Sequence, residues 1–72
     1  MKVPDLTKVE SSRFQSMGHS SHGLFVRFNG GALYQYHDVP EVVFDRGVKA
    51  ESKGKWFQTE IKGHYKHSLV DE

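Results

Sequence analysis

The chain has 72 residues, with ten lysines and arginines, nine acidic residues and no cysteine. A chain this short buries only about 60% of its unfolded surface, which predicts one small domain with a thin core. The net charge of +1 favours no class of partner, and the lack of cysteine excludes disulfides and thiolate metal sites. The N-terminal MKVPDLTKVE lacks the apolar region of a secretory signal, and no apolar run approaches the ~20 residues of a membrane span. We therefore expect a soluble, cytoplasmic protein without a membrane partner.

Residues 1–8 mix charges with a proline and show no periodicity, so we expect a flexible arm. Residues 12–19 alternate weakly around Phe14, and strand is favoured over helix because serines and Gly18 disfavour helix. Residues 20–23, SSHG, are typical of a turn.

Residues 23–28 and 32–37 predict a hairpin across Asn29-Gly30-Gly31. Asn29-Gly30 suits a type I′ turn, and Gly31 leaves room for a bulge. The two-residue period puts five residues on the expected core face: Leu24, Val26, Phe28, Tyr34 and Tyr36. The other face, expected to be open to solvent, carries Phe25, Arg27, Leu33, Gln35 and His37. A slip of one residue in the turn would exchange the two faces.

A first helix is expected after this hairpin. Asp38 is a candidate N-cap with Glu41 three residues on, as in a capping box, and Pro40 fits the first turn. This helix would run to about Ala50. Gly47 makes it weak on its own, since glycine costs about 1 kcal/mol relative to alanine, so packing must hold it.

A second helix is expected over residues 53–62, with Ser52 as N-cap and Gly63 just past its end. Phe57 and Ile61 form its apolar seam. The predicted fold is α+β: a three-stranded antiparallel meander followed by two short helices packed on one face. Residues 9–67 would form the single domain, and residues 68–72 a frayed tail.

Many residues of these elements follow one another in a recognisable order: Ser12, Gly18, Phe28, Gly31, Tyr34, Tyr36, Val39, Pro40, Ala50, Ser52, Lys53, Gly54, Phe57, Ile61, Gly63 and Tyr65. This order resembles the KTSC domain, a family named for its occurrence at the C-terminus of some lysyl-tRNA synthetases. The family also includes stand-alone small bacterial or phage-related proteins, and the resemblance covers residues 9–66. It implies a single domain with a suspected RNA-binding role, and it carries over no catalytic or ligand residues. One departure is His19, where the family would have an aromatic residue such as Tyr.

Charge is unevenly distributed along the chain. Residues 53–67 contain four lysines (Lys53, Lys55, Lys62 and Lys66) against Glu60, whereas the rest of the chain is net acidic. Such lysines can contact phosphates in a salt-sensitive manner. On the open sheet face, Phe25, Arg27 and His37 could contact bases or phosphates. These residues predict a small non-enzymatic domain that binds RNA with low sequence specificity, although the lysines could equally be a solvated helix face.

The alternative function is a protein–protein interaction module, in which the open sheet face docks a protein partner. We expect a monomer in either case. Tyr34 and Tyr36 are expected in the core rather than in a binding platform.

The chain carries no motif of a hydrolase, metalloprotease or phosphate-binding loop, so we expect no enzyme, no catalytic residues and no cofactor. Two histidine pairs at i, i+3 spacing, His19/His22 and His64/His67, could ligate a metal, but we expect them to be surface residues.

Overall fold

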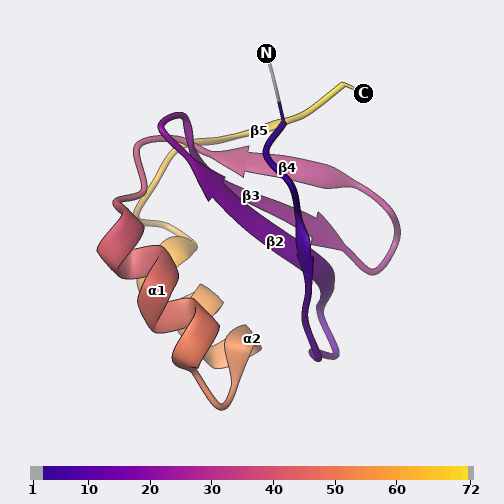
Figure 1. Cartoon of the computed structure of the whole chain (residues 1–72), viewed down its shortest axis with the longest axis vertical. Helices are drawn as coiled ribbons and strands as arrows, with labels where there is room; N and C mark the ends of the chain where they lie inside the picture. Colours follow the sequence, from indigo (N-terminus) through magenta and orange to yellow (C-terminus); the bar gives the residue numbers. More distant parts are fainter. Residues whose placement is uncertain (1–2, 72) are drawn as a thin grey trace.

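The computed structural model describes residues 3–71, and Figure 1 shows a sheet with the helices against one side. The strands are β1 (Thr7–Lys8), β2 (Phe14–Ser20), β3 (Gly23–Phe28), β4 (Leu33–Tyr36) and β5 (His67–Leu69). The helices are α1 (Glu41–Lys49), α2 (Lys53–Trp56) and the π-helical turn η1 (Phe57–Ile61) that continues α2.

The described residues form a five-stranded antiparallel sheet in the order β1-β2-β3-β4-β5. The predicted α+β class is confirmed, but the prediction of three strands is wrong. The two additional strands are the sheet edges, which are two and three residues long and wholly exposed. They show no apolar alternation because neither face of them is buried, so a pattern search cannot find them. Strand β5 runs from the last residue of the expected domain into the expected frayed tail, and β1 lies in the expected arm; Met1, Lys2 and Glu72 lie outside the described residues.

The central hairpin has the predicted register. Leu24 pairs with Tyr36 and Val26 with Tyr34, so the expected core face is confirmed. Phe57 of η1 packs on this face, with its ring centroid 5.3 Å from that of Tyr36. Together with Phe14 and Met17 of β2 and residues of both helices, these side chains make up the main core.

The turn of this hairpin differs from the prediction. Phe28 accepts from the Gly31 amide at 2.9 Å and donates to the Ala32 carbonyl at 2.9 Å, and Gly31 has φ +95°. This is a three-residue loop with a left-handed glycine at its third position. The predicted type I′ turn is wrong, because such a turn needs positive φ at Asn29 and Gly30, and neither adopts it.

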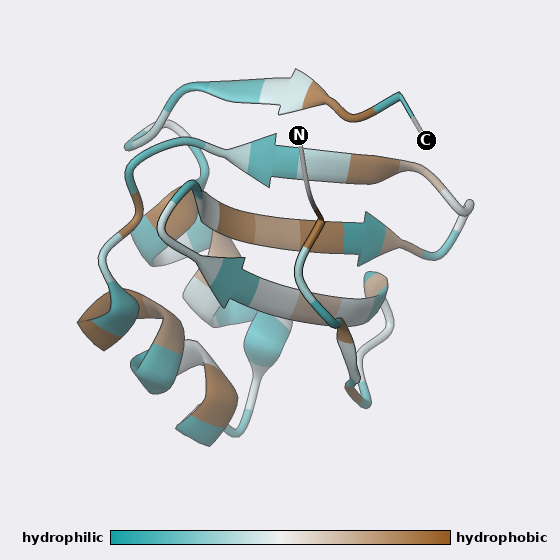
Figure 2. Ribbon diagram, turned by 45° about the horizontal axis from the view of Figure 1, so that its top comes forward, coloured by the Kyte–Doolittle hydropathy of each residue, from teal (hydrophilic) through white to brown (hydrophobic). Residues whose placement is uncertain are grey.

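The second face of the sheet is covered at its centre, which contradicts the expectation of an open face. Phe25 and Leu33 are 0% and 1% exposed, and Gln35 is 3% exposed. Gly18 lies opposite Phe25 in the register, and a Cβ on Gly18 would come within 2.7 Å of the Asp5 carbonyl oxygen. The N-terminal segment therefore crosses this face, in front of the strands in Figure 2, while α2 and η1 lie behind them. The arm has no periodicity of its own, so the sequence pattern could not indicate this cover.

The end of β2 accommodates the unusual His19. Its imidazole stacks on the ring of Phe44 at a centroid distance of 5.5 Å, and Nε2 lies 2.6 Å from the Val39 carbonyl oxygen. His19 thereby joins β2 to the first turn of α1.

Helix α1 begins without the predicted side-chain cap. Asp38 has φ +63°, and Pro40 is the N-cap residue, with no hydrogen bond from a capping side chain. The capping role expected of Asp38 is therefore wrong. The weak helix is instead held by packing, as its composition predicts, because Trp56 of α2 fills the space beside Gly47.

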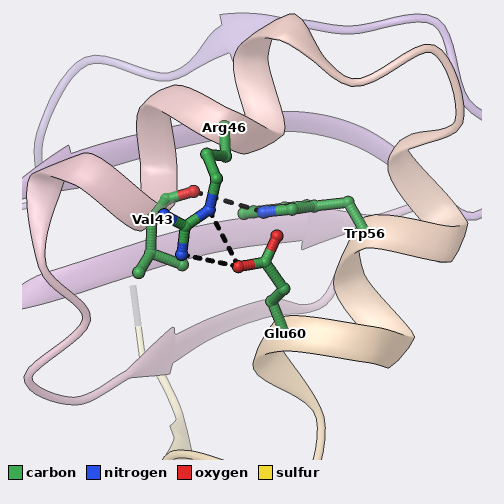
Figure 3. A network of polar contacts seen from close by, with 4 residues as sticks. All are labelled: Val43, Arg46, Trp56 and Glu60. Atoms are coloured by element: carbon green, nitrogen blue, oxygen red, sulfur yellow. Dashed lines mark hydrogen bonds and ion pairs between the residues drawn. The ribbon is translucent and has the colours of Figure 1, made fainter.

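Figure 3 shows the polar contacts that join α1 to α2 and η1. The buried indole of Trp56 donates from Nε1 to the Val43 carbonyl at 3.2 Å. At the surface, Arg46 donates from Nε and Nη2 to Oε1 of Glu60 at 2.9 and 2.7 Å. The hydrogen bond to Glu60 raises the pKa of Arg46 above its usual value. The two helices are therefore fixed to each other both inside and outside the core.

The cap predicted for the second helix is confirmed. Ser52 Oγ accepts from the Lys55 amide at 3.2 Å. The helix ends in a wide turn in which the Lys62 amide donates to the Phe57 carbonyl at 2.9 Å, and Gly63 follows with φ +83°. This ending leads the chain back to the sheet, where β5 joins β4.

Candidate nucleic-acid interface

The seven residues predicted to contact nucleic acid fall on different parts of the molecule. Lys53 and Lys55 lie in α2, Lys62 follows η1, and Lys66 precedes β5. The other three, Phe25, Arg27 and His37, belong to the second face of the sheet, on the side away from the helices. The structure therefore does not bring the seven residues together into one surface.

The second-face residues are engaged within the fold. Phe25 has no exposed surface, so its ring cannot stack on a base. Arg27 donates from Nη1 to the Gly31 carbonyl at 2.8 Å, and His37 Nε2 lies 2.9 Å from Ser68 Oγ. Arg27 and His37 are themselves half-buried.

Lys53 also has a structural role. Its Nζ donates to the carbonyls of Val48 and Ala50 at 3.1 and 3.0 Å, at the C-terminal end of α1. An ammonium group here is favourable because the last carbonyls of a helix lack intrahelical partners. Lys53 therefore stabilises the α1–α2 connection, while Lys55, Lys62 and Lys66 are exposed.

Arg13 is a cation that the sequence reasoning missed. Its amide donates to Ser11 Oγ at 3.1 Å, and its carbonyl accepts from the Asn29 amide at 3.1 Å. The side chain runs along α2, where its Cδ would lie 3.2 Å from a Cβ on Gly54. With the Gln58 amide in its hydrogen-bonding orientation, Oε1 accepts from both terminal nitrogens of Arg13. Arg13 is thus an exposed guanidinium held in a defined position.

Two hollows meet at Arg13. The first, which we call the serine pocket, has a volume of ≈ 470 Å³ and is lined by Glu10, Ser11, Ser12, Arg13, Glu51, Ser52, Lys53, Gly54, Lys55 and Gln58. Its hydroxyl groups and three cations suit a phosphate, but Glu10 and Glu51 offset two of the three positive charges. The pocket is therefore a weak anion site.

The second hollow, the aromatic groove, has a volume of ≈ 270 Å³ and is lined by Arg13, Phe28, Tyr36, Phe57, Lys62, Gly63 and His67. It combines aromatic rings with two permanent cations, and no carboxylate lines it. Pockets that enclose a drug-sized ligand usually exceed about 300 Å³, so this groove suits a single base or sugar-phosphate unit.

The rings around the aromatic groove contact one another. Phe28 meets Phe57 and Tyr34 edge-to-face at 5.6 Å, and His67 lies 5.3 Å from Tyr36. Phe28 and Tyr34 are half-buried, whereas Tyr36 is 7% exposed, as expected of a core tyrosine. Burial raises the pKa of the Tyr36 hydroxyl, and the neighbouring Tyr34 raises it further.

The sequence contained only partial signals for this groove. Lys62 was selected by the local excess of lysine, but Arg13 stands far from that segment in an acidic part of the chain. Phe28 was assigned to the core face, but it is only half-buried in the folded chain. Both facts are set by tertiary packing rather than by local pattern.

Two further classes of site can be assessed from side-chain positions. Within residues 3–71, no three His, Cys, Asp or Glu side chains are arranged to hold a metal ion. In the same part of the chain, no helix is both long and apolar enough to cross a bilayer.

Comparison with known proteins places the chain in a family. The KTSC domain model matches residues 10–65. A Tsukamurella paurometabola protein is 38% identical over 60 residues, covering 81% of this chain and 90% of that protein. The crystal structure of a KTSC domain protein from Yersinia pestis superposes with a TM-score of 0.87 at 32% identity, covering 93% of this chain and 97% of that one. A lysine–tRNA ligase of Trichormus variabilis is 30% identical over 67 residues, which are 93% of this chain but only 11% of the ligase. The chain belongs to the KTSC domain family.

Proposed function

We propose that this chain is a non-enzymatic domain that binds single-stranded nucleic acid, RNA in the first instance, with low sequence specificity. The observation that carries the proposal is Arg13, which lines both the serine pocket and the aromatic groove. A strand with its base over Phe28 in the groove could place adjacent phosphates near Arg13 and Lys62. Phosphate contacts combined with aromatic stacking are the usual means of binding single strands without reading sequence.

The proposal revises the predicted contact set. Lys55 and Lys62 remain proposed phosphate contacts, and Arg13 is added to them. Lys66 lines neither hollow and is a secondary candidate. Phe28 replaces Phe25 as the ring that can meet a base, because Phe25 is buried and Phe28 is not. The relation to a lysine–tRNA ligase supports RNA as the first ligand to try.

The alternative of a protein-docking sheet face has less support. Its two large apolar residues, Phe25 and Leu33, are covered, so the face offers no apolar patch at its centre. A partner would first have to displace the N-terminal segment.

Fluorescence anisotropy with a labelled oligouridine tests the proposal, measured at low and at physiological salt. We expect the binding constant to fall as salt rises. In a plot of its logarithm against the logarithm of the salt concentration, the slope should become less steep by about 0.7 for each phosphate contact removed. Arg13→Gln and Lys62→Gln should each weaken binding and flatten the slope. Lys49→Gln is the matched control, since Lys49 is an exposed lysine of α1 that lines neither hollow.

If Arg13→Gln and Lys49→Gln weakened binding equally, the loss of one positive charge anywhere would explain the result. That outcome would contradict the proposed binding site. No binding at low salt with RNA in excess would overturn the function itself. Duplex DNA and single-stranded DNA of the same length, run in parallel, establish whether single strands and ribose are preferred.

A further inference from the structure

Strand β5 leaves one edge of the sheet without a neighbouring strand among residues 3–71, as Figure 2 shows along the outermost ribbon. The pairing with β4 is visible in two hydrogen bonds: the His37 amide donates to the Lys66 carbonyl, and the Val70 amide donates to the Leu33 carbonyl, both at 2.8 Å. In an antiparallel pair, alternate residues bond to the neighbour and the residues between them point away from it. The amides and carbonyls of His67, Leu69 and Asp71 therefore point outward.

The side chains along this outward edge are also exposed. Leu69 is 64% exposed, which makes it the most exposed large apolar side chain of the described residues. It lies opposite Tyr34 in the register, so it stands on the same face of the sheet as the helices. Natural sheets usually guard an open edge with proline, a bulge or an inward charge. Residues 67–71, HSLVD, have no proline, and their centre carries no charge.

We propose that this edge binds the β5 strand of a second copy of the chain, antiparallel, with the twofold axis at Leu69. In this register Leu69 faces its own counterpart, and His67 faces Asp71 of the other copy on both sides of the axis. All three residues have outward backbone groups, so each of these facing pairs exchanges two hydrogen bonds. Registers centred on Ser68 or His67 lose the complementarity, because they place leucine opposite histidine or histidine opposite itself.

The complementarity is of shape and of hydrogen bonding. The two leucines cover each other at the centre, and each imidazole can donate to a carboxylate at either end. Cross-strand pairs of these kinds are stabilising, and they repeat by symmetry. A twofold axis normal to the sheet also leaves both aromatic grooves on the same side of the joined sheet. The interface is short, so we expect a weak, concentration-dependent dimer in place of the expected monomer.

Sedimentation velocity from micromolar to millimolar protein tests the proposal. We expect the mass to rise toward twice that of the chain. Leu69→Lys should weaken dimerisation by about tenfold or more, since it removes the apolar pair and sets two like charges opposite each other. Val42→Lys is the control, because Val42 is a similarly exposed apolar residue, 59%, on α1. A protein that stays monomeric at millimolar concentration, or equal effects of the two variants, would overturn the proposal.

Disulfide trapping reads the register directly, because the chain has no cysteine of its own. Facing Cα atoms in a hydrogen-bonded antiparallel pair lie about 5.5 Å apart, within the range a disulfide spans. Under mild oxidation, Leu69→Cys should cross-link faster than His67→Cys, Ser68→Cys or Val42→Cys. Faster cross-linking of any of the other three would contradict the axis at Leu69.

Discussion

The indole ring of Trp56 occupies the space that a side chain on Gly47 would need. A Cβ at Gly47 would overlap Cε2 and Cζ2 of the ring, and the indole Nε1 is already fixed by its bond to the Val43 carbonyl. Glycine lowers the intrinsic stability of α1, but it is the residue that lets α1 approach α2 this closely. The relationship explains why Gly47 is buried inside α1 despite the cost of glycine in a helix.

Gly47→Ala should therefore destabilise the fold although alanine favours helix. Overpacking costs about 1–3 kcal/mol, and the gain in helix propensity offsets about 1 kcal/mol of it, so we expect a net loss of about 1 kcal/mol and at most about 2 kcal/mol. Urea unfolding followed by Trp fluorescence measures it. Gly30→Ala is the matched control, because a Cβ at Gly30 meets nothing within 4 Å. A Gly47→Ala protein as stable as the parent would show that Trp56 can move aside.

Gly18→Ala should loosen the N-terminal segment from the sheet. The new Cβ would approach the Asp5 carbonyl to 2.7 Å and the Leu6 Cδ2 to 3.0 Å, closer than side-chain carbons ordinarily come. Hydrogen exchange at the Val9 amide, which donates to the Gln15 carbonyl at 3.0 Å, reports the change. We expect faster exchange at Val9 and unchanged exchange at Val26 in the sheet centre. Equal rates in both proteins would contradict the close crossing.

Ser52→Ala should cost about 1 kcal/mol of unfolding free energy, since the Lys55 amide loses the oxygen that caps α2. Thermal or urea unfolding checks the value. Ser21→Ala, the same change at an exposed serine in the turn between β2 and β3, should cost clearly less. A reversed order would mean that the cap contributes little.

Tyr36 should make the fold sensitive to alkali. Burial raises its pKa above the usual tyrosine value of 10.0, so the folded state holds the phenol proton to higher pH than the unfolded state does. The resulting stabilisation is complete below about pH 10 and is lost as the pH rises through the folded pKa. Tyr36→Phe keeps the ring contacts and removes the proton, so stability should fall less steeply above pH 10, by up to about 1.4 kcal/mol per pH unit. The measurement is the unfolding free energy of the parent and of Tyr36→Phe from about pH 9 to about pH 11, which brackets the usual tyrosine pKa by about one unit on each side. The same dependence on pH in the two proteins would contradict the raised pKa.

Local sequence pattern predicted the strand pairing and the core face of the central hairpin, but it did not predict what covers the second face or the two edge strands. The alternation in residues 23–37 predicted the pairing of Leu24 with Tyr36, because one buried face fixes the register of a hairpin. The exposure of Phe25 was mispredicted because the N-terminal segment, which carries no repeating signal, crosses the sheet with Asp5 and Leu6 against Gly18, the residue opposite Phe25. Strand β5 was missed because none of its three residues is buried.

The candidate site, too, could be predicted only in part from the sequence. The lysine-rich segment was visible in the sequence, but counting charge along the chain cannot reveal which cations share a surface. Arg13 meets Gly54 and Gln58 only after β2 and α2 have packed. Phe28 is half-buried and Phe14 is buried, although both rings contact Phe57 of η1, and no local sequence pattern distinguishes the two.

The most direct test of the proposed nucleic-acid interface is an amide chemical-shift titration of labelled protein with a short oligouridine at low and at physiological salt. The account predicts perturbations at Arg13, Phe28, Lys62, Gly63 and His67 that weaken as salt rises, with little change at Phe25 and Lys49. Perturbations centred on the second sheet face, around Arg27 and His37, would contradict the proposed groove. The absence of any shift with RNA in large excess at low salt would contradict nucleic-acid binding altogether.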